Sequence, residues 1–221
     1  MKEYKVEFVT GHFLINDDRG SKVLLDTGSP LSFHADGIVA LNGKTYNVRT
    51  SLGGADSRYV TDNVGTAVSG LVGMDILGES NILIDAPGGR VVFDYATDGM
   101  TRVASSQGAY VFMEMEIRGR RVKVILDTGA PISYVSSSLT EGLEVVDVVD
   151  DFNPAVPGGK YRVPRYEFSA AFAGHEFLMR AGHLPPDLQM AVSILGVKGV
   201  VGIDVLKHQP VLVADGVWVN N

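Results

Sequence analysis

The sequence has no cysteine among its 221 residues, which excludes disulfides, thiolate metal sites and cysteine nucleophiles. It also lacks clusters of Lys and Arg, and its formal net charge of −7 argues against nucleic acid as a partner. No apolar run approaches the ~18 residues of a membrane-spanning helix, and the opening MKEYKVEFVTGHF has no apolar core of a signal peptide. We therefore expect a soluble, cytoplasmic protein that binds neither membranes nor nucleic acid.

Motifs for metals and organic cofactors are missing as well. The histidines are scattered and form no His-x-x-x-His pair; they are His12, His34, His175, His183 and His208. Neither a glycine-rich dinucleotide or phosphate loop nor a Gly-x-Ser-x-Gly stretch is present. The sequence thus predicts no metal site and no cofactor.

Hydrophobic residues alternate with polar ones over short stretches, beginning with Tyr4, Val6 and Phe8. This alternation is typical of a half-buried strand, and turn signals such as Asn42-Gly43 separate the stretches. Amphipathic segments of about 10 to 15 residues do not alternate with them, which argues against a parallel α/β sheet. With 45% hydrophobic and 20% charged residues, the chain is predicted to be a globular all-β protein with short helices.

One stretch of the sequence occurs twice. VLLDTGSPLSF at residues 23–33 returns as VILDTGAPISY at residues 124–134, 101 positions later and without a gap. A second pair follows in the same order, with LVGMDIL at residues 71–77 and VVGIDVL at residues 200–206. We interpret the two ordered pairs of landmarks as an internal duplication.

The duplication predicts how the chain is divided. It indicates two similar lobes, residues 1–103 and residues 104–221, with the polar segment Thr97–Gly108 as their linker. The chain ends and the segment Arg90–Tyr95 are expected to form a sheet that joins the lobes. The second lobe has the longer middle, because its two landmark aspartates lie 77 residues apart, against 49 in the first.

The repeated Asp-Thr-Gly puts one aspartate of each copy, Asp26 and Asp127, where an apolar strand ends. A single copy is equally well explained as a turn, in which Asp and Thr cap backbone groups and Gly supplies a positive φ. Two copies favour a function, because duplication can bring both carboxylates to a shared axis. Two carboxylates held close together share a proton and can act as general acid and general base in a hydrolysis.

With two landmarks in each copy, the sequence resembles the aspartic proteases of the pepsin and retroviral types. The family's Asp-Thr-Gly after apolar residues, and its later apolar pair before a glycine, occur in both halves of the chain. The resemblance covers most of the chain, and Gly-x-Asp-x-Leu after the apolar pair is closer to the retroviral type. It implies a bilobal acid-protease fold, with both halves of a retroviral-type dimer fused in one monomeric chain.

The resemblance also implies roles for the loop residues. Asp26 and Asp127 would be the catalytic dyad of an aspartic endopeptidase, which activates a water molecule to hydrolyse an extended peptide or protein substrate. The threonines of the loops would lock them together, and the glycines would let the backbone contact the substrate. The supporting loop residues are Thr27, Gly28, Ser29, Thr128, Gly129 and Ala130.

The residue after each Asp-Thr-Gly bears on the pH of activity. Pepsin-type enzymes generally have a hydroxyl there, which Ser29 keeps and Ala130 lacks. One fewer hydrogen bond to the charged dyad raises its pKa values above those of pepsins. We therefore expect activity at mildly acidic to near-neutral pH.

Glycine-rich tips in both halves are candidates for flaps that close on a substrate, as the resemblance implies. The candidate flap residues are Leu52, Gly53, Gly54 and Ala55 in the first half, and Pro157, Gly158 and Gly159 in the second. Glycine in a hairpin also indicates an ordinary turn. Tyr46 and Tyr59 both lie near the first tip, and either can be the tyrosine that the family carries in its flap.

Further aspartates have structural explanations. Asp75 and Asp204 belong to the second landmark and are predicted to form salt bridges or to cap the short helix that begins there. Asp147, Asp150 and Asp151 are expected in solvated loops.

Two other functions compete with peptide hydrolysis. A non-catalytic peptide-binding adaptor or sensor would keep the fold and the cleft without the reaction. Hydrolysis of a glycoside by two carboxylates needs them farther apart than two symmetry-related loops would place them. The peptidase is the preferred hypothesis, because both aspartates of the repeated motif are intact.

Overall fold

The computed structural model describes residues 1–105, 109–156 and 159–220. Strands account for 49% of the structure and helices for 11%, which confirms the predicted all-β class. The helices of the described residues are short: α1 (Ser57–Val64), α2 (Met74–Leu77), α3 (Pro186–Ile194) and a 3-10 turn at Ser137–Leu139. None of the helices in these ranges is long and apolar enough to cross a membrane.

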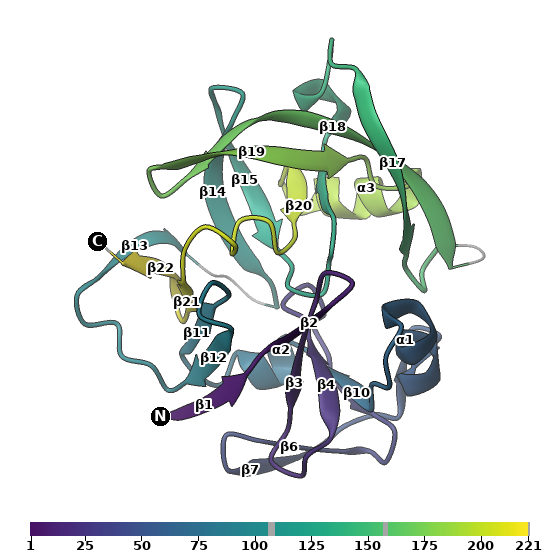
Figure 1. The fold of residues 1–221 in the computed structure, drawn as a ribbon, viewed down its shortest axis with the longest axis vertical. Coiled ribbons are helices and arrows are strands. Elements are labelled where there is room, and N and C mark those ends of the chain that lie inside the picture. Colours follow the sequence, from purple (N-terminus) through teal and green to yellow (C-terminus); the bar gives the residue numbers. More distant parts are fainter. Residues whose placement is uncertain (106–108, 157–158, 221) are drawn as a thin grey trace.

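Three sheets carry most of the strands (Figure 1). A five-stranded sheet has the order β2 (Glu7–Val9), β3 (His12–Asn16), β4 (Lys22–Leu25), β10 (Gly70–Val72), β5 (Phe33–His34). A seven-stranded sheet has the order β14 (Val111–Ile117), β15 (Arg120–Leu126), β20 (Gly199–Val201), β16 (Ser133–Val135), β19 (His175–Gly182), β18 (Lys160–Phe172), β17 (Val145–Phe152). A six-stranded sheet has the order β1 (Lys2–Lys5), β12 (Arg90–Phe93), β11 (Ile82–Asp85), β21 (Val211–Val213), β22 (Gly216–Asn220), β13 (Met100–Ser105).

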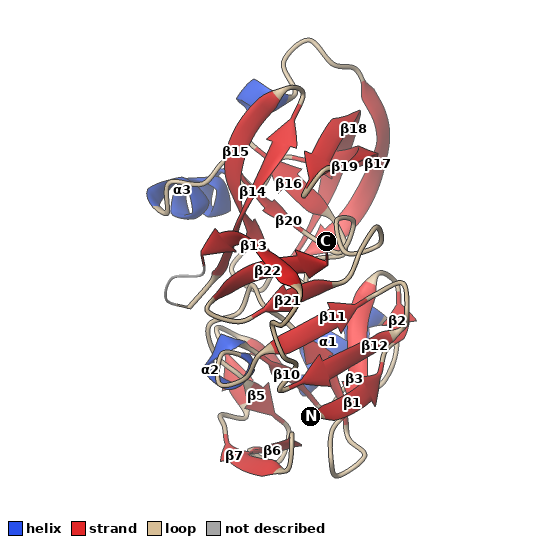
Figure 2. Ribbon diagram, turned by 90° about the vertical axis from the view of Figure 1, so that its left-hand side faces the viewer, coloured by secondary structure: helices blue, strands red, loops and turns tan. Residues whose placement is uncertain are grey.

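The remaining strands form two hairpins, β6 (Ile38–Leu41) with β7 (Lys44–Asn47) and β8 (Ser51–Leu52) with β9 (Ala55–Asp56). Residues 1–99, the first half, contribute the five-stranded sheet, and residues 100–220, the second half, contribute the seven-stranded sheet. Figure 2 shows the six-stranded sheet between these two.

The duplicated sequence forms the same arrangement of three strands in each half. In the first half β4 runs parallel to β10, and β10 is antiparallel to β5. In the second half β15 runs parallel to β20, and β20 is antiparallel to β16. The register also agrees, because Leu25 pairs with Val72 and Leu126 pairs with Val201. All four side chains are buried, as expected where apolar strands are covered on both faces.

Gly73 and Gly202 directly follow the central strand of each arrangement. Only glycine fits at these positions, because the backbone of the Asp-Thr-Gly loop passes too close for a side chain. A Cβ on Gly73 would lie 2.7 Å from the carbonyl oxygen of Ser29, and one on Gly202 would overlap the carbonyl oxygen of Ala130. The N–H of Met74 donates to that same Ser29 oxygen at 2.8 Å. The glycine of the second landmark therefore lets the loop that begins with the repeated aspartate pack closely against it.

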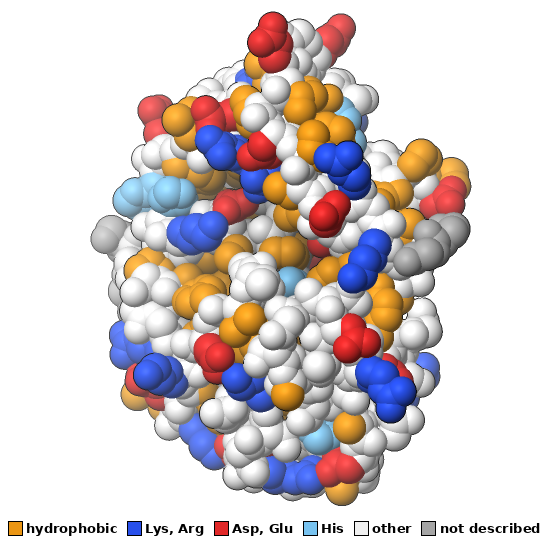
Figure 3. Space-filling model, turned by 45° about the vertical axis from the view of Figure 1, so that its right-hand side comes forward, with side chains coloured by type: hydrophobic (Ala, Val, Ile, Leu, Met, Phe, Trp, Pro, Cys, Tyr) orange, Lys and Arg blue, Asp and Glu red, His pale blue; other side chains and the backbone are white. Residues whose placement is uncertain are grey.

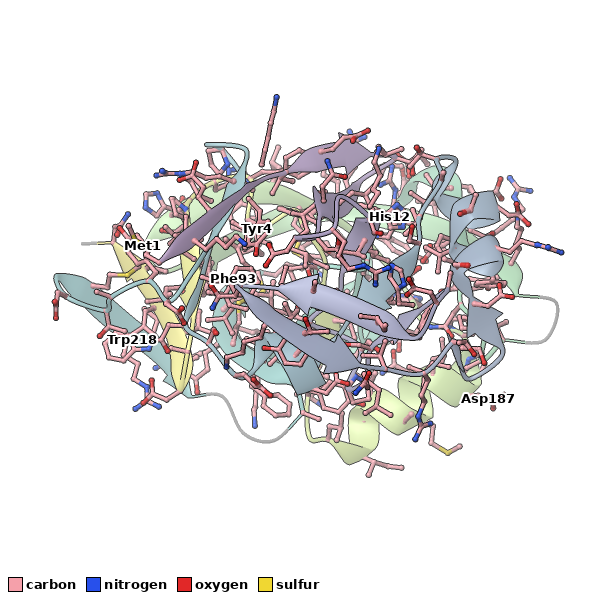
Figure 4. The ribbon with its side chains drawn as sticks, turned by 90° about the horizontal axis from the view of Figure 1, so that it is seen from below. Met1, Tyr4, His12, Phe93, Asp187 and Trp218 are labelled. Atoms are coloured by element: carbon pink, nitrogen blue, oxygen red, sulfur yellow. The ribbon has the colours of Figure 1, made fainter. Side chains whose placement is uncertain are left out.

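The six-stranded sheet joins the two halves. Strand β11 of the first half is antiparallel to β21 of the second, with Leu83 opposite Leu212. Each continues into its own hairpin partner, β12 or β22, and β1 and β13 are the outer strands. Tyr4 of β1 packs edge-on against Phe93 of β12, with 5.4 Å between ring centroids (Figure 4). The expected joining sheet of the chain ends and Arg90–Tyr95 is therefore present.

The segment expected to be a linker instead contains a strand. Strand β13 occupies Met100–Ser105 within the predicted linker Thr97–Gly108 and pairs with β22. Its Val103 and Ala104 are half-buried and pack against the main core, which explains why a mostly polar segment joins a sheet. The predicted division between residues 103 and 104 falls inside this strand, and residues 106–108 lie outside the described residues.

One large cluster of buried side chains extends through both halves. Phe13 and Val72 of the first half, Met113 and Val201 of the second, and Val213 of the joining sheet all belong to it. A contiguous cluster of this kind marks a single core. The two halves therefore share their core across the joining sheet.

Replacing Leu212 by Ala tests the joining sheet. Leu212 is fully buried and packs with Leu83 and Val92, so we expect the free energy of unfolding to fall by about 2–5 kcal/mol. Leu178→Ala is the matched control, because Leu178 on β19 is 70% exposed and its truncation should cost at most about 0.5 kcal/mol. Urea unfolding measures both variants, and equal losses would contradict the central place of this sheet.

Candidate active site

The two Asp-Thr-Gly loops lie against each other. The N–H of Asp26 donates to the carbonyl of Val72 at 3.0 Å, and the N–H of Asp127 donates to the carbonyl of Val201 at 2.9 Å. These equivalent bonds place both side chains at the same ends of their strands, and each carboxyl group lies against the glycine of the other loop. Both aspartates are half-buried, so solvent reaches the pair. The structure thus brings the two predicted catalytic residues together.

Thr27 and Thr128 hold the two loops by reciprocal hydrogen bonds. The hydroxyl of Thr27 donates to the carbonyl of Leu126 at 2.7 Å and accepts from the N–H of Thr128 at 3.0 Å. The hydroxyl of Thr128 donates to the carbonyl of Leu25 at 2.8 Å and accepts from the N–H of Thr27 at 3.0 Å. Both threonines are buried, so these hydroxyls replace water as partners of buried backbone groups. The geometry agrees with the locking role expected of them.

Gly28 and Gly129 leave room for the carboxylate of the opposite loop. A Cβ on Gly129 would lie 2.5 Å from Cγ of Asp26, and one on Gly28 would overlap the carboxylate of Asp127. Any side chain at either position would displace the carboxylate of the opposite loop. Glycine is therefore required by the approach of the loops, whereas the expected contact of their backbone with a substrate stays a prediction.

Backbone N–H groups of the loops donate to the carboxylates. Oδ1 of Asp26 accepts from Gly28 N–H and from Ser29 N–H, both at 2.9 Å. Oδ1 of Asp127 accepts from Gly129 N–H at 2.9 Å. Each loop therefore solvates its own carboxylate with fixed dipoles, which favours the charged form.

The Ser29 hydroxyl has a different partner from the one expected. It donates to the carbonyl of Leu31 at 2.8 Å, so the prediction that it bonds to the dyad is wrong. Serine hydroxyls commonly bond to a nearby backbone group in this way. Ser29 and Ala130 both donate a backbone N–H to the aspartate of their own loop. The difference between their side chains therefore affects the pKa values of the dyad less than the sequence suggests.

Burial raises the pKa of both aspartates above the ordinary carboxyl range. For Asp26, repulsion by Asp127 and the hydrogen bond between them add to burial, while the N–H groups of Gly28 and Ser29 lower the pKa. For Asp127, burial is opposed by the hydrogen bond with Asp26 and by backbone N–H groups, and the charge of Asp151 raises the pKa further. Two such carboxyls titrate as a unit. The pair therefore binds a proton more readily than exposed carboxyls do.

Ser32 and Ser133 tie each loop to the second landmark, a connection that the sequence analysis missed. The hydroxyl of Ser32 donates to Asp75 at 2.5 Å and accepts from the N–H of Gly73 at 2.8 Å. The hydroxyl of Ser133 lies 3.3 Å from a carboxylate oxygen of Asp204. The signal was present, because the two serines occupy the same place in the repeated stretch.

The expected roles of Asp75 and Asp204 are confirmed only in part. Asp75 lies in the first turn of α2, but that helix has no side-chain cap, so capping by Asp75 is wrong. Asp204 forms a salt bridge with Lys207 at 2.8 Å, as predicted. Bonding to the loop serines explains why both copies keep an aspartate.

The first candidate flap is the small hairpin of β8 and β9. Leu52 and Ala55 pack in the apolar cluster of the first half that contains Phe33. A Cβ built at Gly53 or Gly54 would meet no atom within 4 Å. These are the contacts of an ordinary hairpin, and a role of this segment as a flap stays a prediction.

The second candidate flap lies at the end of the long hairpin of β17 and β18. The carbonyl of Gly159 accepts a hydrogen bond from the Tyr59 hydroxyl at 3.4 Å, whereas Pro157 and Gly158 lie outside the described residues. Tyr59 belongs to α1, which Figure 1 shows beside this hairpin. Tyr46 is part of β7, at the opposite end of the first half (Figure 1). Of the two tyrosines, Tyr59 is the one beside a candidate flap.

Asp147, Asp150 and Asp151 are not in the solvated loops that were expected. All three belong to strand β17, where Asp150 is exposed, Asp151 is 8% exposed and Asp147 bonds to Arg165 at 2.7 Å. The hydroxyls of Tyr134 and Tyr161 donate to the Asp151 carboxylate. Alternation along the strand turns Asp151 inward, which three acidic residues in a short stretch do not reveal.

The surroundings of the dyad show no group of metal ligands. In the part of the chain that the structure describes, no three His, Asp or Glu side chains lie close enough to hold a metal ion together.

No model of a known protein family matches the chain, and no curated protein matches it either. The function is therefore inferred from the geometry of the site.

Thr27→Val tests the bonds that hold the loops. The substitution leaves the N–H of Thr128 and the carbonyl of Leu126 without their hydrogen-bond partner. Each such buried group lowers the stability of the fold by about 1–3 kcal/mol. We expect the free energy of unfolding to fall by about 2–4 kcal/mol, measured by urea unfolding. Thr27→Ser is the control that keeps the hydroxyl, and it should lose about 1 kcal/mol for the missing methyl group. Similar losses in both variants would mean that packing, and not hydrogen bonding, holds the loops.

Proposed function

We propose that the chain is an aspartic endopeptidase whose dyad is Asp26 and Asp127. One observation carries the proposal: two copies of one motif, 101 residues apart, bring each carboxyl group against the glycine of the other copy while both aspartates stay half-buried. A pair of turns with only a structural purpose would not need two ionisable groups whose pKa values are both raised by burial. The threonine bonds and the two glycines serve to bring these groups together.

The chemistry follows from one proton shared by two carboxyls. The charged carboxylate accepts a proton from a water molecule as that water attacks the peptide carbonyl carbon, while the protonated carboxyl donates to the carbonyl oxygen. The tetrahedral intermediate then collapses, the C–N bond breaks, and a proton moves to the leaving amine. The two carboxyls titrate as one unit, and either can hold the shared proton.

The proposal includes the fold of the pepsin and retroviral enzymes in a single chain. Its support is the three-strand arrangement that occurs in each half and the sheet that joins the halves through β11 and β21. In this proposal residues 1–103 and 104–221 are the two lobes, and one chain supplies both aspartates, so a monomer is active. Neither a metal nor an organic cofactor takes part.

An extended peptide is the proposed substrate class. Strand-like hydrogen bonding to a hairpin is a common way to hold such a chain, and the hairpin of β17 and β18 reaches the first half at Tyr59. Figure 3 shows hydrophobic side chains gathered across the middle of the face that it presents. Apolar side chains of a substrate would match such a surface.

Cleavage of a mixed peptide library between pH 3 and pH 8 tests the proposal. The wild-type chain is compared with Asp26→Asn and Asp127→Asn, and mass spectrometry identifies the cuts. We expect cuts by the wild type at mildly acidic to near-neutral pH, because both pKa values of the dyad are raised. Either substitution should lower the rate at least ~100-fold, since the pair works as one unit.

Two outcomes would contradict the endopeptidase. Substantial cleavage by either single variant would exclude a shared dyad. An intact library with all three folded proteins would exclude peptide hydrolysis, and binding of an extended peptide by them would favour the non-catalytic adaptor. Circular dichroism of each variant ensures that the comparison is between folded proteins.

A further inference from the structure

Asp151 is a buried carboxylate that the proposed reaction does not use. It lies on β17 opposite Tyr161 of β18 and is 8% exposed. The hydroxyls of Tyr161, at 3.3 Å, and of Tyr134 donate to its Oδ2. A buried charge is costly unless it is hydrogen-bonded. The two tyrosine hydroxyls therefore stabilise the buried carboxylate of Asp151.

Tyr134 connects this carboxylate to the loop of Asp127. It belongs to β16, which follows that loop directly, and it pairs with Val200 of β20. The adjacent Val201 accepts the hydrogen bond from the N–H of Asp127. The tyrosine hydroxyl is therefore fixed to the strands that seat the second catalytic loop.

The first half has no equivalent of this bond. The residue that corresponds to Tyr134 in the repeat is Phe33, which is 1% exposed and packs in an apolar cluster. The long hairpin of β17 and β18 likewise belongs to the second half alone. The Tyr134 hydroxyl and the hairpin of β17 and β18 thus both occur only in the second half, and the hydroxyl bonds to Asp151 of that hairpin.

Phe152, the neighbour of Asp151, reaches the first half. Its ring lies 5.6 Å from the ring of His12 on β3 and 6.0 Å from the ring of Tyr59 on α1, between centroids. His12 is 2% exposed, and its Nε2 has no hydrogen-bond partner among the described residues. Two adjacent residues of β17 therefore connect the halves. Asp151 bonds to Tyr134, which follows the loop of Asp127, and Phe152 packs against the first half.

We infer that Asp151 is a positioning residue of the proposed active site, which holds Phe152 against the first half and places a buried carboxylate, through Tyr134, next to the strands that carry the loop of Asp127. The inference rests on the proposed function. Its two parts are separable, because one acts through packing and the other through charge.

The electrostatics agree with the geometry. Burial raises the pKa of Asp151, and the hydrogen bonds from Tyr134, Phe152 N–H and Tyr161, with the nearby His12, oppose that rise. The charge of Asp151 in turn raises the pKa of Asp127. Burial lowers the pKa of His12, so this ring stays neutral at neutral pH. The titratable groups that act on Asp151 and on the dyad are thus Asp26, Asp127, His12, Tyr59, Tyr134 and Tyr161.

Asp151→Asn separates charge from shape, because the amide still accepts hydrogen bonds from the tyrosines. Removing the charge lowers the pKa of Asp127, so the acidic limb of the kcat/KM profile should move to lower pH by about 0.5–1 unit. Asp150→Asn is the matched control: the same substitution on the same strand, at an exposed position. Its profile should coincide with that of the wild type. An acidic limb of Asp151→Asn that also coincides with the wild type would overturn the electrostatic part.

Tyr134→Phe tests the packing part with the residue that the first half already uses at this place. We expect the fold to be kept and KM to rise about 3- to 10-fold with a smaller change in kcat, because Phe152 is no longer held by Asp151. Tyr161→Phe removes the longer bond to the same carboxylate and should have the smaller effect. Unchanged KM in Tyr134→Phe would overturn this part.

Failure of the proposed function can be told apart from failure of this inference. If the wild type cleaves no peptide, the endopeptidase fails, and the carboxyl ¹³C signal of Asp127 is titrated in the wild type and in Asp151→Asn. A lower pKa of Asp127 in the variant would still support the charge beside it. An identical pKa would overturn the inference by itself.

Discussion

The reciprocal hydrogen bonds of Thr27 and Thr128 are the constraint on which the rest of the site depends. Each hydroxyl joins the strand end of one half to the loop of the other, and both are buried. They bring the loops so close that only glycine fits beside the opposing carboxylate. Electrostatic repulsion between Asp26 and Asp127 is the cost of that approach, and the shared proton offsets it.

The halves repeat the same supports but are not equivalent. Strand pairing, the seating glycine and the loop serine recur in both. The second half adds the long hairpin of β17 and β18, and with it a tyrosine hydroxyl where the first half has Phe33. The buried carboxylate of Asp151 raises the pKa of Asp127. The two chemically identical aspartates therefore have different surroundings.

Much of the fold was predictable because a repeated sequence folds alike in both places. The meeting of Asp26 and Asp127, the joining sheet and the all-β class all follow from the repeat and from period-2 alternation. Side-chain partners did not follow: the Ser29 hydroxyl bonds to a carbonyl two residues later, and Asp151 turns inward on a strand read as a loop. Such choices depend on tertiary neighbours, and a short acidic stretch has the same composition whether it is solvated or half-buried.

The most direct test is a titration of the aspartate carboxyl ¹³C signals of the wild-type chain, with Asp26→Asn and Asp127→Asn used for assignment. The account predicts that Asp26 and Asp127 titrate as a coupled pair, whose first proton binds at a pH clearly above the ordinary value of about 3.9 for aspartate. It also predicts that Asp127→Asn lowers the pKa of Asp26, because the repulsion by Asp127 is removed. Two independent titrations near the ordinary value would show that the carboxyls do not share a proton, and would contradict the proposed dyad.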